Sequence, residues 1–585
     1  MELDDVENES LLEKRQALTE SLYELPYDLV IYLQRAAVYS NLGYPDLAAG
    51  DAYRALLLSD EVCNESFEYH EQASEALRPY STGAFPDVLQ NSSVSAVLPH
   101  IQEVADECMD LSIGEADLAV RRLAKLASIR CFQTLSISLL LCGCLKSAYE
   151  FCSRGLALLP GDVELLQAQD YVRKLIQRRL KGETADFHDF PDQGLVRREV
   201  YPWNDHEPDR FSDETLDFLN AQLSTIAPKC AVKVTELPTL IENADSADSF
   251  GILPTNKQLG LFAQDDIAPL ETVLEEISVL TANNRLKESL CDACSSRLPE
   301  LGAERQAVPC DDCQDTMFCD ETCYQRAMNS YHPAVCDKDV DTIAKDPDPK
   351  EAPNALYLLL LARALAMSAT QETHPLDLKE VKYIWGDFLP PTLNAIPRAS
   401  DAEPPPVWTL PFSFSSNISG PLHLLERMDV DIFTTLASHD LWIFNTLYAK
   451  FRGTASARLS TRDGRPEVAA VHPLWCLANH DCDPNVQWEW GGHMRLWARE
   501  TRVDPQHGRG GIRAGDEILN HYCDIALSVG QRREWAQGSL GGWCMCLRCR
   551  REEAELRIGS MKLGDGDGEE EEAAWKGRVE QPEGP

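Results

Sequence analysis

Apolar residues recur at helical spacing through the first third of the chain, and part of this pattern is repeated. Residues 25–60 and 125–160 share a pattern at an offset of 100 positions. Matching small and apolar residues are Gly43 and Gly143, Ala48 and Ala148, Leu56 and Leu156, and Leu58 and Leu158. A further amphipathic segment at 162–180 predicts a following or capping helix. The pattern therefore predicts pairs of closely packed antiparallel helices.

The repeated pattern resembles the tetratricopeptide (TPR) repeat, in which Gly is followed five residues later by Ala and then by an apolar pair. Pro160 closes the second copy, whereas Asp60 stands there in the first. The offset of 100 is close to three periods of about 34 residues. Such an array can offer a concave peptide-binding surface, or its helices can simply pack against the rest of the protein. The pattern leaves both alternatives open.

The pattern changes after this helical region. Residues 182–229 contain many Pro, Asp and Glu, and we interpret them as a linker with a short helix near 212–223. The apolar alternation of 231–235 predicts a strand that begins near Cys230. The long apolar run at 356–367 is shorter than the ~20 residues of a membrane helix and predicts a buried helix.

Composition and charge narrow the classes of function. The chain has 585 residues, 44% hydrophobic and 25% charged, which is typical of a globular protein with about three to four domains. Its 54 basic and 95 acidic residues give a net charge of −41. This charge disfavours nucleic acid binding and favours encounters with basic partners such as Lys-rich tails. The acidic start, MELDDVENES, lacks a secretory signal, so we expect the nucleus or cytoplasm and no membrane partner.

Seven of the 20 cysteines lie between residues 291 and 336. Clustered cysteines in a reducing compartment indicate metal binding rather than disulfides. The spacing is Cys291-x2-Cys294, Cys310-x2-Cys313, Cys319-x3-Cys323 and His332-x3-Cys336. Zinc prefers four Cys or His ligands, so eight ligands predict two closed, structural zinc sites.

The order of these ligands resembles the MYND zinc finger, with Phe318 before Cys319 and Gln325 just after Cys323. In that family the two sites interleave. The resemblance implies that Cys291, Cys294, Cys319 and Cys323 hold one ion and that Cys310, Cys313, His332 and Cys336 hold the other. Such fingers bind Pro-containing peptides, so a partner protein and simple support of folding are both open roles.

Further motifs flank the finger on both sides. They are Gly260-Leu261-Phe262-Ala263, Asn479-His480-Asp481-Cys482-Asp483-Pro484-Asn485, the segment from Gly515 to Asp524, and Cys544-x-Cys546-x2-Cys549. Upstream of the finger, 260–276 reads as a strand, a Pro-containing turn and a second strand. In this order the motifs resemble the SET domain of the SET-and-MYND (SMYD-like) lysine methyltransferases, over residues 230–553. The added N-terminal repeats resemble the TPR-SET proteins of fungi.

The resemblance implies a multidomain α+β protein, with an α-helical array, a mixed-β SET domain split by the finger, and a post-SET zinc site. It places a TPR-like region at 1–181, a linker at 182–229, SET parts at 230–285 and 441–540, the finger at 286–340, a helical insert at 341–440, a post-SET segment at 541–553 and an acidic disordered tail at 554–585.

The resemblance also implies the functional residues. S-adenosylmethionine (SAM) would contact Gly260, Asn445, Asn479, His480 and Tyr522, and Tyr522 would be the catalytic residue in a lysine channel. A third structural zinc would be held by Cys482, Cys544, Cys546 and Cys549. The set is chemically reasonable because the CxCxxC segment alone supplies only three of four ligands.

The implied function is SAM-dependent methylation of a protein lysine, with a histone as one candidate substrate. The alternative is a catalytically silent SET–MYND scaffold that binds partner proteins through its repeats and finger. One feature separates the two. The family has two glycines in the cofactor loop, whereas this chain has Lys257-Gln258-Leu259 before Gly260.

Overall fold

The computed structural model describes most of the chain. The described residues are 2–82, 85–90, 115–179, 190–238, 255–286, 289–300, 302, 304–385, 409–460, 462–504, 508–540 and 542–563. The predicted acidic run at 564–572 lies outside them.

The fold is mixed α/β, rich in helices with several small sheets. The chain divides into two compact units. Unit 1 comprises Met1–Leu219, Glu276–Cys476 and Trp490–Met494, and unit 2 comprises Asn220–Glu275, Leu477–Glu489 and Arg495–Pro585. Each unit is described by itself.

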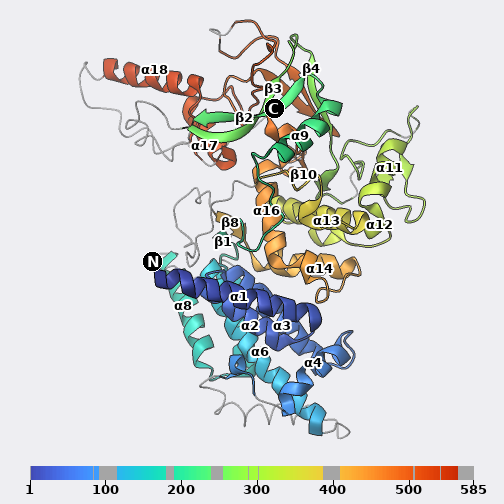
Figure 1. Ribbon diagram of the computed structural model, residues 1–585, viewed down its shortest axis with the longest axis vertical. Helices are drawn as coiled ribbons and strands as arrows, with labels where there is room; N and C mark the ends of the chain where they lie inside the picture. Colours follow the sequence, from blue (N-terminus) through green and yellow to red (C-terminus); the bar gives the residue numbers. More distant parts are fainter. Residues whose placement is uncertain are drawn as a thin grey trace. The chain divides into compact units, whose positions relative to one another are not determined.

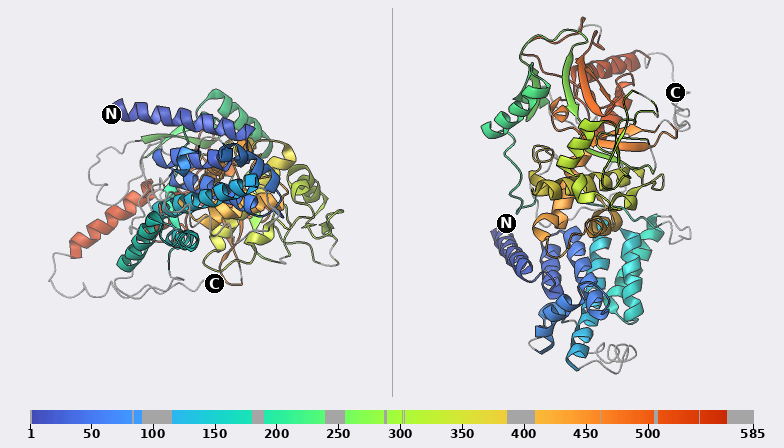
Figure 2. Two further views of the ribbon diagram at one scale, coloured as in Figure 1. Left: turned by 90° about the horizontal axis from the view of Figure 1, so that it is seen from below. Right: turned by 90° about the vertical axis from the view of Figure 1, so that its right-hand side faces the viewer.

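Unit 1 begins with helices that pack side by side (Figure 1). They are α1 (Glu2–Glu24), α2 (Leu29–Asn41), α3 (Pro45–Cys63), α4 (His70–Thr82), the 3-10 turn η1 (Asp87–Leu89), α6 (Glu115–Cys142), α7 (Leu145–Leu158) and α8 (Val163–Arg179). The two views of Figure 2 show the same lateral packing of α2, α3 and α6. The prediction of a helical N-terminal region is confirmed.

The repeated sequence forms two helical hairpins, α2–α3 and α6–α7. Each hairpin turns at a glycine with positive φ, 77° at Gly43 and 89° at Gly143. Side chains other than glycine rarely adopt this backbone conformation, which explains why both copies keep this residue. Ala48 and Ala148 are fully buried, which agrees with close helix approach.

A buried ion pair joins α2 to α3 within the first hairpin. The guanidinium of Arg35 donates two hydrogen bonds of 2.7 Å to the carboxylate of Asp51. A second carboxylate, that of Asp440, lies 3.1 Å from the same guanidinium. All three side chains are almost completely buried. This network ties the hairpin to the start of α16 (Leu441–Thr454).

The remainder of unit 1 combines helices with short strands. Its elements are β1 (Gly194–Arg197), β5 (Leu280–Asn283), β6 (Val308–Pro309), β7 (Met317–Phe318), α11 (Glu321–Ser330), α12 (His332–Val335), η3 (Asp341–Ala344), α13 (Ala352–Gln371), η4 (Pro375–Asp377), β8 (Thr409–Phe412), η5 (Phe414–Ser419), α14 (Gly420–Arg427), α15 (Leu436–His439), α16 (Leu441–Thr454), β9 (Ser456–Leu459) and β10 (Pro466–Val471). Strand β10 pairs antiparallel with both β5 and β9.

The predicted buried helix at 356–367 is the centre of α13. Its apolar side chains contact β5, β10 and α16, and Leu360, Leu361, Ala364 and Leu365 are fully buried. The described part of α6 (Asp117–Cys142) and α13 are both long and apolar enough to cross a membrane. Most of each helix is buried inside the protein, so their hydrophobicity is that of core helices.

Part of the segment interpreted as a linker is packed into unit 1. Strand β1 pairs antiparallel with β8, with Leu195 opposite Pro411. The nearby side chain of Tyr201 is 3% exposed and stacks on Trp203 with ring centroids 5.3 Å apart. Because the partner strand lies far along the sequence, the local composition did not reveal β1. The short helix expected near 212–223 is α9 (Asp213–Ile226).

Unit 2 is built mainly from strands, followed by two helices. Its elements are β2 (Cys230–Pro238), β3 (Thr255–Ala263), β4 (Thr272–Ile277), β11 (Val486–Trp490), β12 (His493–Ala498), α17 (Val529–Leu540) and α18 (Leu547–Leu563). β2 and β3 form an antiparallel pair, and β11, β12 and β4 form a three-stranded sheet in that order. The predicted strand near Cys230 and the predicted strand, turn and strand at 260–276 are confirmed.

Candidate functional site

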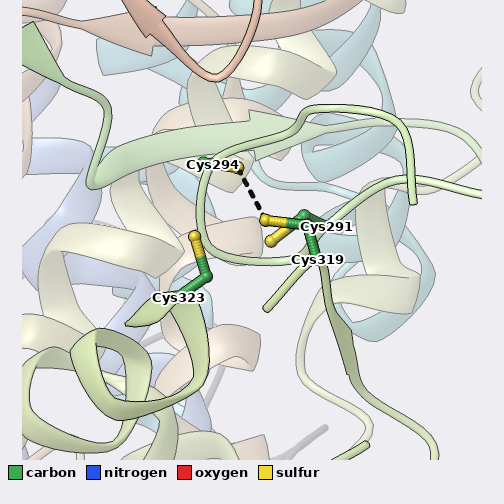
Figure 3. Close-up of side chains that lie close together, drawn as sticks. All are labelled: Cys291, Cys294, Cys319 and Cys323. Atoms are coloured by element: carbon green, nitrogen blue, oxygen red, sulfur yellow. Dashed lines mark hydrogen bonds between the residues drawn. The ribbon is translucent and has the colours of Figure 1, made fainter. Parts of the chain in front are cut away.

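The first predicted metal cluster is assembled in unit 1. The sulfurs of Cys291, Cys294, Cys319 and Cys323 all lie within 4.8 Å of one another. They turn toward a common centre (Figure 3), and the sulfurs of Cys294 and Cys319 are 3.8 Å apart. Hydrogen bonds with Cys291 and Cys319 hold the pKa of the Cys294 thiol well below its usual range. The arrangement favours a thiolate ready to bind a cation.

The second cluster contains Cys310, Cys313, His332 and Cys336. The sulfurs of Cys310 and Cys336 are 3.7 Å apart, and Nε2 of His332 lies 3.7 Å from the sulfur of Cys313. The grouping matches the interleaved division that the resemblance to a MYND finger implies. In both clusters the four ligands are drawn from two separated pairs along the chain.

Local structure holds these ligands in place. Strands β6 and β7 form a hairpin whose connecting turn carries Cys310 and Cys313. The side chain of Asp320 caps α11 by accepting a hydrogen bond of 2.8 Å from the backbone N–H of Cys323. The hydroxyl of Tyr331 donates to the carboxylate of Asp292 at 2.6 Å. The guanidinium of Arg363, from α13, lies 3.5 Å from the centre of the Tyr331 ring. The finger is therefore anchored to the core helix of unit 1.

The third cluster lies in unit 2 and joins Cys482 to the C-terminal cysteines Cys544, Cys546 and Cys549. The sulfur of Cys482 is 3.4 Å from that of Cys549 and 3.9 Å from that of Cys544. The guanidinium of Arg548 donates to the carbonyl of Cys482 at 2.6 Å, which ties the start of α18 to this segment.

The three clusters fit zinc by their donor chemistry and spacing. Four thiolates at about 2.3 Å from a tetrahedral ion lie about 3.8 Å from one another. The measured sulfur separations of 3.8 Å, 3.7 Å and 3.9 Å agree with this value. Each cluster supplies four protein ligands, so each would be a closed structural site without a position for substrate.

The flanking motifs converge within unit 2. The segment 479–485 runs beside 517–520, where the backbone N–H of Asn520 donates to the carbonyl of Asn479 at 2.7 Å, and that of Asp481 donates to the carbonyl of Asn520 at 2.8 Å. Strand β3 joins them, because the N–H of Ile518 donates to the carbonyl of Leu261 at 2.7 Å. Three segments distant in sequence therefore share one hydrogen-bonded centre.

Gly260 lies at the tightest point of this centre. A Cβ atom on Gly260 would come within 2.6 Å of Oε1 of Glu517 and 3.1 Å of Nδ2 of Asn479. The same Asn479 amide donates to the carbonyl of Leu259 at 2.9 Å and to Glu517 at 2.7 Å. Burial raises the pKa of Glu517. The absence of a side chain at Gly260 is what allows the three segments to meet.

Tyr522 is half-buried and is held at both ends. Its hydroxyl donates to the carbonyl of Ala478 at 2.9 Å, and its backbone N–H donates to Nδ1 of His480 at 3.0 Å. The two rings lie with centroids 5.3 Å apart. The structure thus brings together Gly260, Asn479, His480 and Tyr522, four of the five predicted cofactor residues.

The donors of this region are compatible with a polar cofactor. The side chain of Asn520 is fully buried, and its amide nitrogen donates to no atom in the part of the chain that the structure describes. An unpaired buried donor is costly unless it finds an acceptor. This nitrogen is closed to solvent, so a polar ligand would reach it only after the surrounding side chains move.

The residues Lys257-Gln258-Leu259, which stand where the resemblance leads us to expect a glycine-containing loop, lie in strand β3. Lys257 and Gln258 are part of β3 and pair with Glu236 and Thr235 of β2, and Leu259 is 3% exposed. The segment is thus a regular strand instead of a glycine-rich loop.

Asn445 is placed in unit 1, in a buried polar network. Its amide donates to the carboxylate of Asp46 at 2.8 Å and accepts from the amide of Asn417 at 3.1 Å. Burial raises the pKa of Asp46 to about 6. Both polar atoms of the Asn445 side chain are therefore engaged within this network.

The structure also shows groups that the sequence analysis missed. Cys523 is buried, and its sulfur lies close to the sulfur of Cys482 and to a ring nitrogen of His480, so the three form a further close group. In unit 1, His206, His374 and Asp377 also lie close enough to share a cation, and the two imidazole rings stack at 3.9 Å. Motif spacing carries no signal for either group.

No protein-family model matches the chain, and no curated protein is significantly similar to it. The geometry of the chain itself is therefore the ground for a proposal on its function.

Proposed function

We propose that the protein is an S-adenosylmethionine-dependent protein-lysine N-methyltransferase of SET type, divided by a MYND-type finger and preceded by TPR-like repeats. The observation that carries this proposal is the convergence of β3, 479–485 and 517–522 through main-chain hydrogen bonds, next to the Cys482 cluster. These are the segments in which the resemblance places the cofactor site and the lysine channel.

The proposed roles follow from the contacts. At Gly260 and Asn479, strand β3 approaches the segments 479–485 and 517–522 closely, and the backbone of His480 would contact the cofactor. Tyr522 would face the lysine. The zinc ions would stabilise the fold, since all three clusters are closed.

The bound cofactor supplies a methyl group that is already activated on a sulfonium. The protein must then present a neutral amine, and deprotonating a lysine with pKa ~10.4 near neutral pH costs about 4–5 kcal/mol. A desolvated channel lowers this cost because it disfavours the ammonium form. The Tyr522 hydroxyl donates its hydrogen bond to the Ala478 carbonyl. The hydroxyl oxygen can therefore accept a hydrogen bond from the substrate amine and orient it.

The substrate class follows from charge. At −41 the protein would steer toward basic, lysine-rich segments, and a histone tail is one candidate. The same charge disfavours a nucleic acid partner. A nuclear or cytoplasmic setting would keep the cysteines reduced for metal binding.

The first test is a calorimetric titration of SAM into the full-length protein after its zinc content has been measured. Three zinc ions per chain with saturable SAM binding support the enzyme. Three zinc ions without SAM binding would contradict it.

The second test replaces Tyr522 by Phe. We expect turnover on a lysine peptide to fall by about 10²-fold or more, since an orienting hydroxyl is lost, while SAM affinity stays near that of the wild type. Unchanged turnover would remove Tyr522 from the mechanism. The peptide with its lysine replaced by Arg is the matched control for product formation.

A scaffold without activity is the second candidate, and two observations favour it. The Lys257–Leu259 segment is a paired strand, and a hollow of about 600 Å³ lies beside the finger. The hollow is lined by Met328, Asn329, Pro333, Ala334, Lys338, Ala369, Thr370, Met428 and Val430. A zinc-loaded protein that binds no SAM, but binds a Pro-containing peptide with loss of binding in Met328→Glu, would establish this function instead.

A further inference from the structure

His480 links the Cys482 cluster to the backbone of Tyr522 through the two nitrogens of its ring. Nδ1 lies 3.0 Å from the backbone nitrogen of Tyr522, and Nε2 lies 3.4 Å from the sulfur of Cys482. The cofactor role that the resemblance implies for His480 is largely one for its backbone. Its imidazole therefore has a separate task.

The contacts determine the tautomer of this imidazole. A backbone N–H can only donate, so Nδ1 must carry a lone pair, and the neutral ring then holds its proton on Nε2. That N–H points to the sulfur of Cys482. A metal-bound thiolate keeps lone pairs that can accept such a bond, and partners of this kind orient metal ligands.

The hydroxyl of Tyr522 makes a second hydrogen bond to the segment that carries His480. The hydroxyl donates to the carbonyl of Ala478, two residues before His480, at 2.9 Å. The ring of Tyr522 is thus held at its backbone by the imidazole and at its tip by the same chain segment. Cys482 is fully buried and is the one ligand of the third cluster that lies on this segment.

We propose that His480 is a positioning residue whose imidazole, held as the Nε2–H tautomer, couples the metal ligand Cys482 to the placement of Tyr522. Metal binding at the Cys482 cluster orders the cysteine, the cysteine orders the imidazole, and the imidazole fixes the backbone of Tyr522. The effect on catalysis rests on the proposed methyltransferase function, whereas the coupling itself does not.

Two variants each preserve one end of the link. In His480→Asn, the side-chain oxygen occupies the level of Nδ1 and can still accept from Tyr522, but nothing reaches Cys482. In His480→Gln, the longer amide can donate to Cys482, but the acceptor for Tyr522 is lost. Both variants therefore place an amide at position 480, but His480→Asn removes the bond to Cys482 and His480→Gln removes the bond to Tyr522.

The readouts are zinc release to a chelator, hydrogen exchange of the Tyr522 amide and turnover, all on the full-length, zinc-loaded protein. We expect His480→Asn to release the third zinc at least about tenfold faster than His480→Gln, the size expected for loss of an outer partner of a ligand. In the wild type, removal of the third zinc should speed exchange of the Tyr522 amide, whereas in both variants it should change this exchange little, because each lacks one of the two bonds that transmit the order. With zinc bound, we expect the Tyr522 amide to exchange at least about tenfold faster in His480→Gln than in His480→Asn, and kcat to fall further in His480→Gln.

Nitrogen-15 NMR of the wild-type protein, labelled at histidine, adds a direct measurement of the tautomer. A protonated Nδ1 would overturn the proposal. Equal effects of both variants on zinc release and on exchange would overturn it as well, because they would indicate a general loss of structure. Faster zinc release in His480→Asn and faster Tyr522 exchange in His480→Gln, together with no methyltransferase activity in the wild-type protein, would support the coupling and reject the proposed function.

Discussion

The metal clusters of the two units differ in the apolar residues that surround them. In unit 1 one apolar core extends from the hairpins α2–α3 and α6–α7 through α13 and α16 to the cysteines of the finger. In unit 2 the buried cluster around the C-terminal cysteines contains Cys482, Cys523, Cys544, Cys549 and a single apolar residue, Val529. The finger's four-ligand clusters are thus embedded in a large core, whereas the Cys482 cluster forms a small buried group of its own in a unit whose strands bury other apolar residues, such as Leu261, Leu496 and Ile518.

The difference shows what a structural metal contributes. Apolar burial stabilises a fold roughly in proportion to area, so the large core of unit 1 can persist without the finger's ions. Where few apolar side chains are available, metal binding itself becomes part of the folding free energy. We therefore expect the segments joined at the Cys482 cluster, including 479–485 of the candidate site, to depend on metal more than the core of unit 1 does.

The largest expected effect comes from removing one ligand in each unit. In Cys482→Ser we expect loss of one zinc ion and of SAM binding, because a structural zinc contributes on the order of 10 kcal/mol to a small metal-dependent fold. In the matched variant Cys310→Ser we expect loss of one zinc ion, with retained helical circular dichroism and SAM affinity within about threefold. Zinc analysis and calorimetry measure both, and equal loss of SAM binding would contradict the comparison.

A pH effect is expected in unit 1. Glu276 is buried, accepts from the backbone N–H groups of Leu474 and Trp475 at 3.1 Å and 2.8 Å, and burial raises its pKa to about 7. The folded state then holds a proton that the unfolded state releases above pH ~4.5, so stability falls as pH rises from about 4.5 to about 7, by at most about 3 kcal/mol.

Glu276→Gln should lack this dependence, because its amide does not ionise. Urea unfolding of the zinc-loaded protein at pH 5.5 and pH 8 measures the difference between wild type and variant. The exposed neighbour Glu275, changed to Gln, is the control. A constant difference between wild type and Glu276→Gln at both pH values would show that the carboxyl is not protonated in the folded state.

In unit 2 a single methyl group tests the close approach at Gly260. In Gly260→Ala the Cβ would collide with Glu517 and crowd Asn479, and we expect a loss of about 1–3 kcal/mol in stability together with weaker SAM binding. Gly530→Ala is the matched control, since nothing lies within 4 Å of its Cβ. Urea denaturation and calorimetry report both quantities, and equal behaviour of the two variants would refute the close approach.

The smallest expected effect is a difference between Asn445 and Asn479 in their contributions to stability and to SAM binding. Asn445→Ala should lower the stability of unit 1 by about 1–2 kcal/mol, because the bonds to Asp46 and Asn417 are lost, and leave SAM affinity unchanged. Asn479→Ala should weaken SAM binding. Thermal unfolding measures the stability of each variant, and calorimetric titration measures its SAM affinity. A drop in SAM affinity in Asn445→Ala would show that Asn445 contributes to cofactor binding.

Much of the candidate site follows from short-range patterns. The finger ligands fall within 46 positions, so their spacing already indicated two four-ligand sites, and the resemblance to the MYND finger implied the two groups that the structure assembles. The repeated small and apolar residues likewise predicted pairs of antiparallel helices, whereas the positive φ of Gly43 and Gly143 at the turns is seen only in the structure. The union of Cys482 with the C-terminal cysteines was implied by the resemblance to the SET domain and agrees with the unfilled fourth ligand of the CxCxxC segment.

What the sequence determined by itself was therefore local: helical periodicity, strand alternation, and the spacing of ligands for one ion. Tertiary structure decided the rest, such as the pairing of β1 with β8, the steric demand at Gly260, the buried network of Asn445 and the bridge from Cys482 through His480 to Tyr522. These features depend on atoms from distant segments meeting at hydrogen-bond or contact distance. No periodicity along the chain records such meetings, because they arise only when the segments pack.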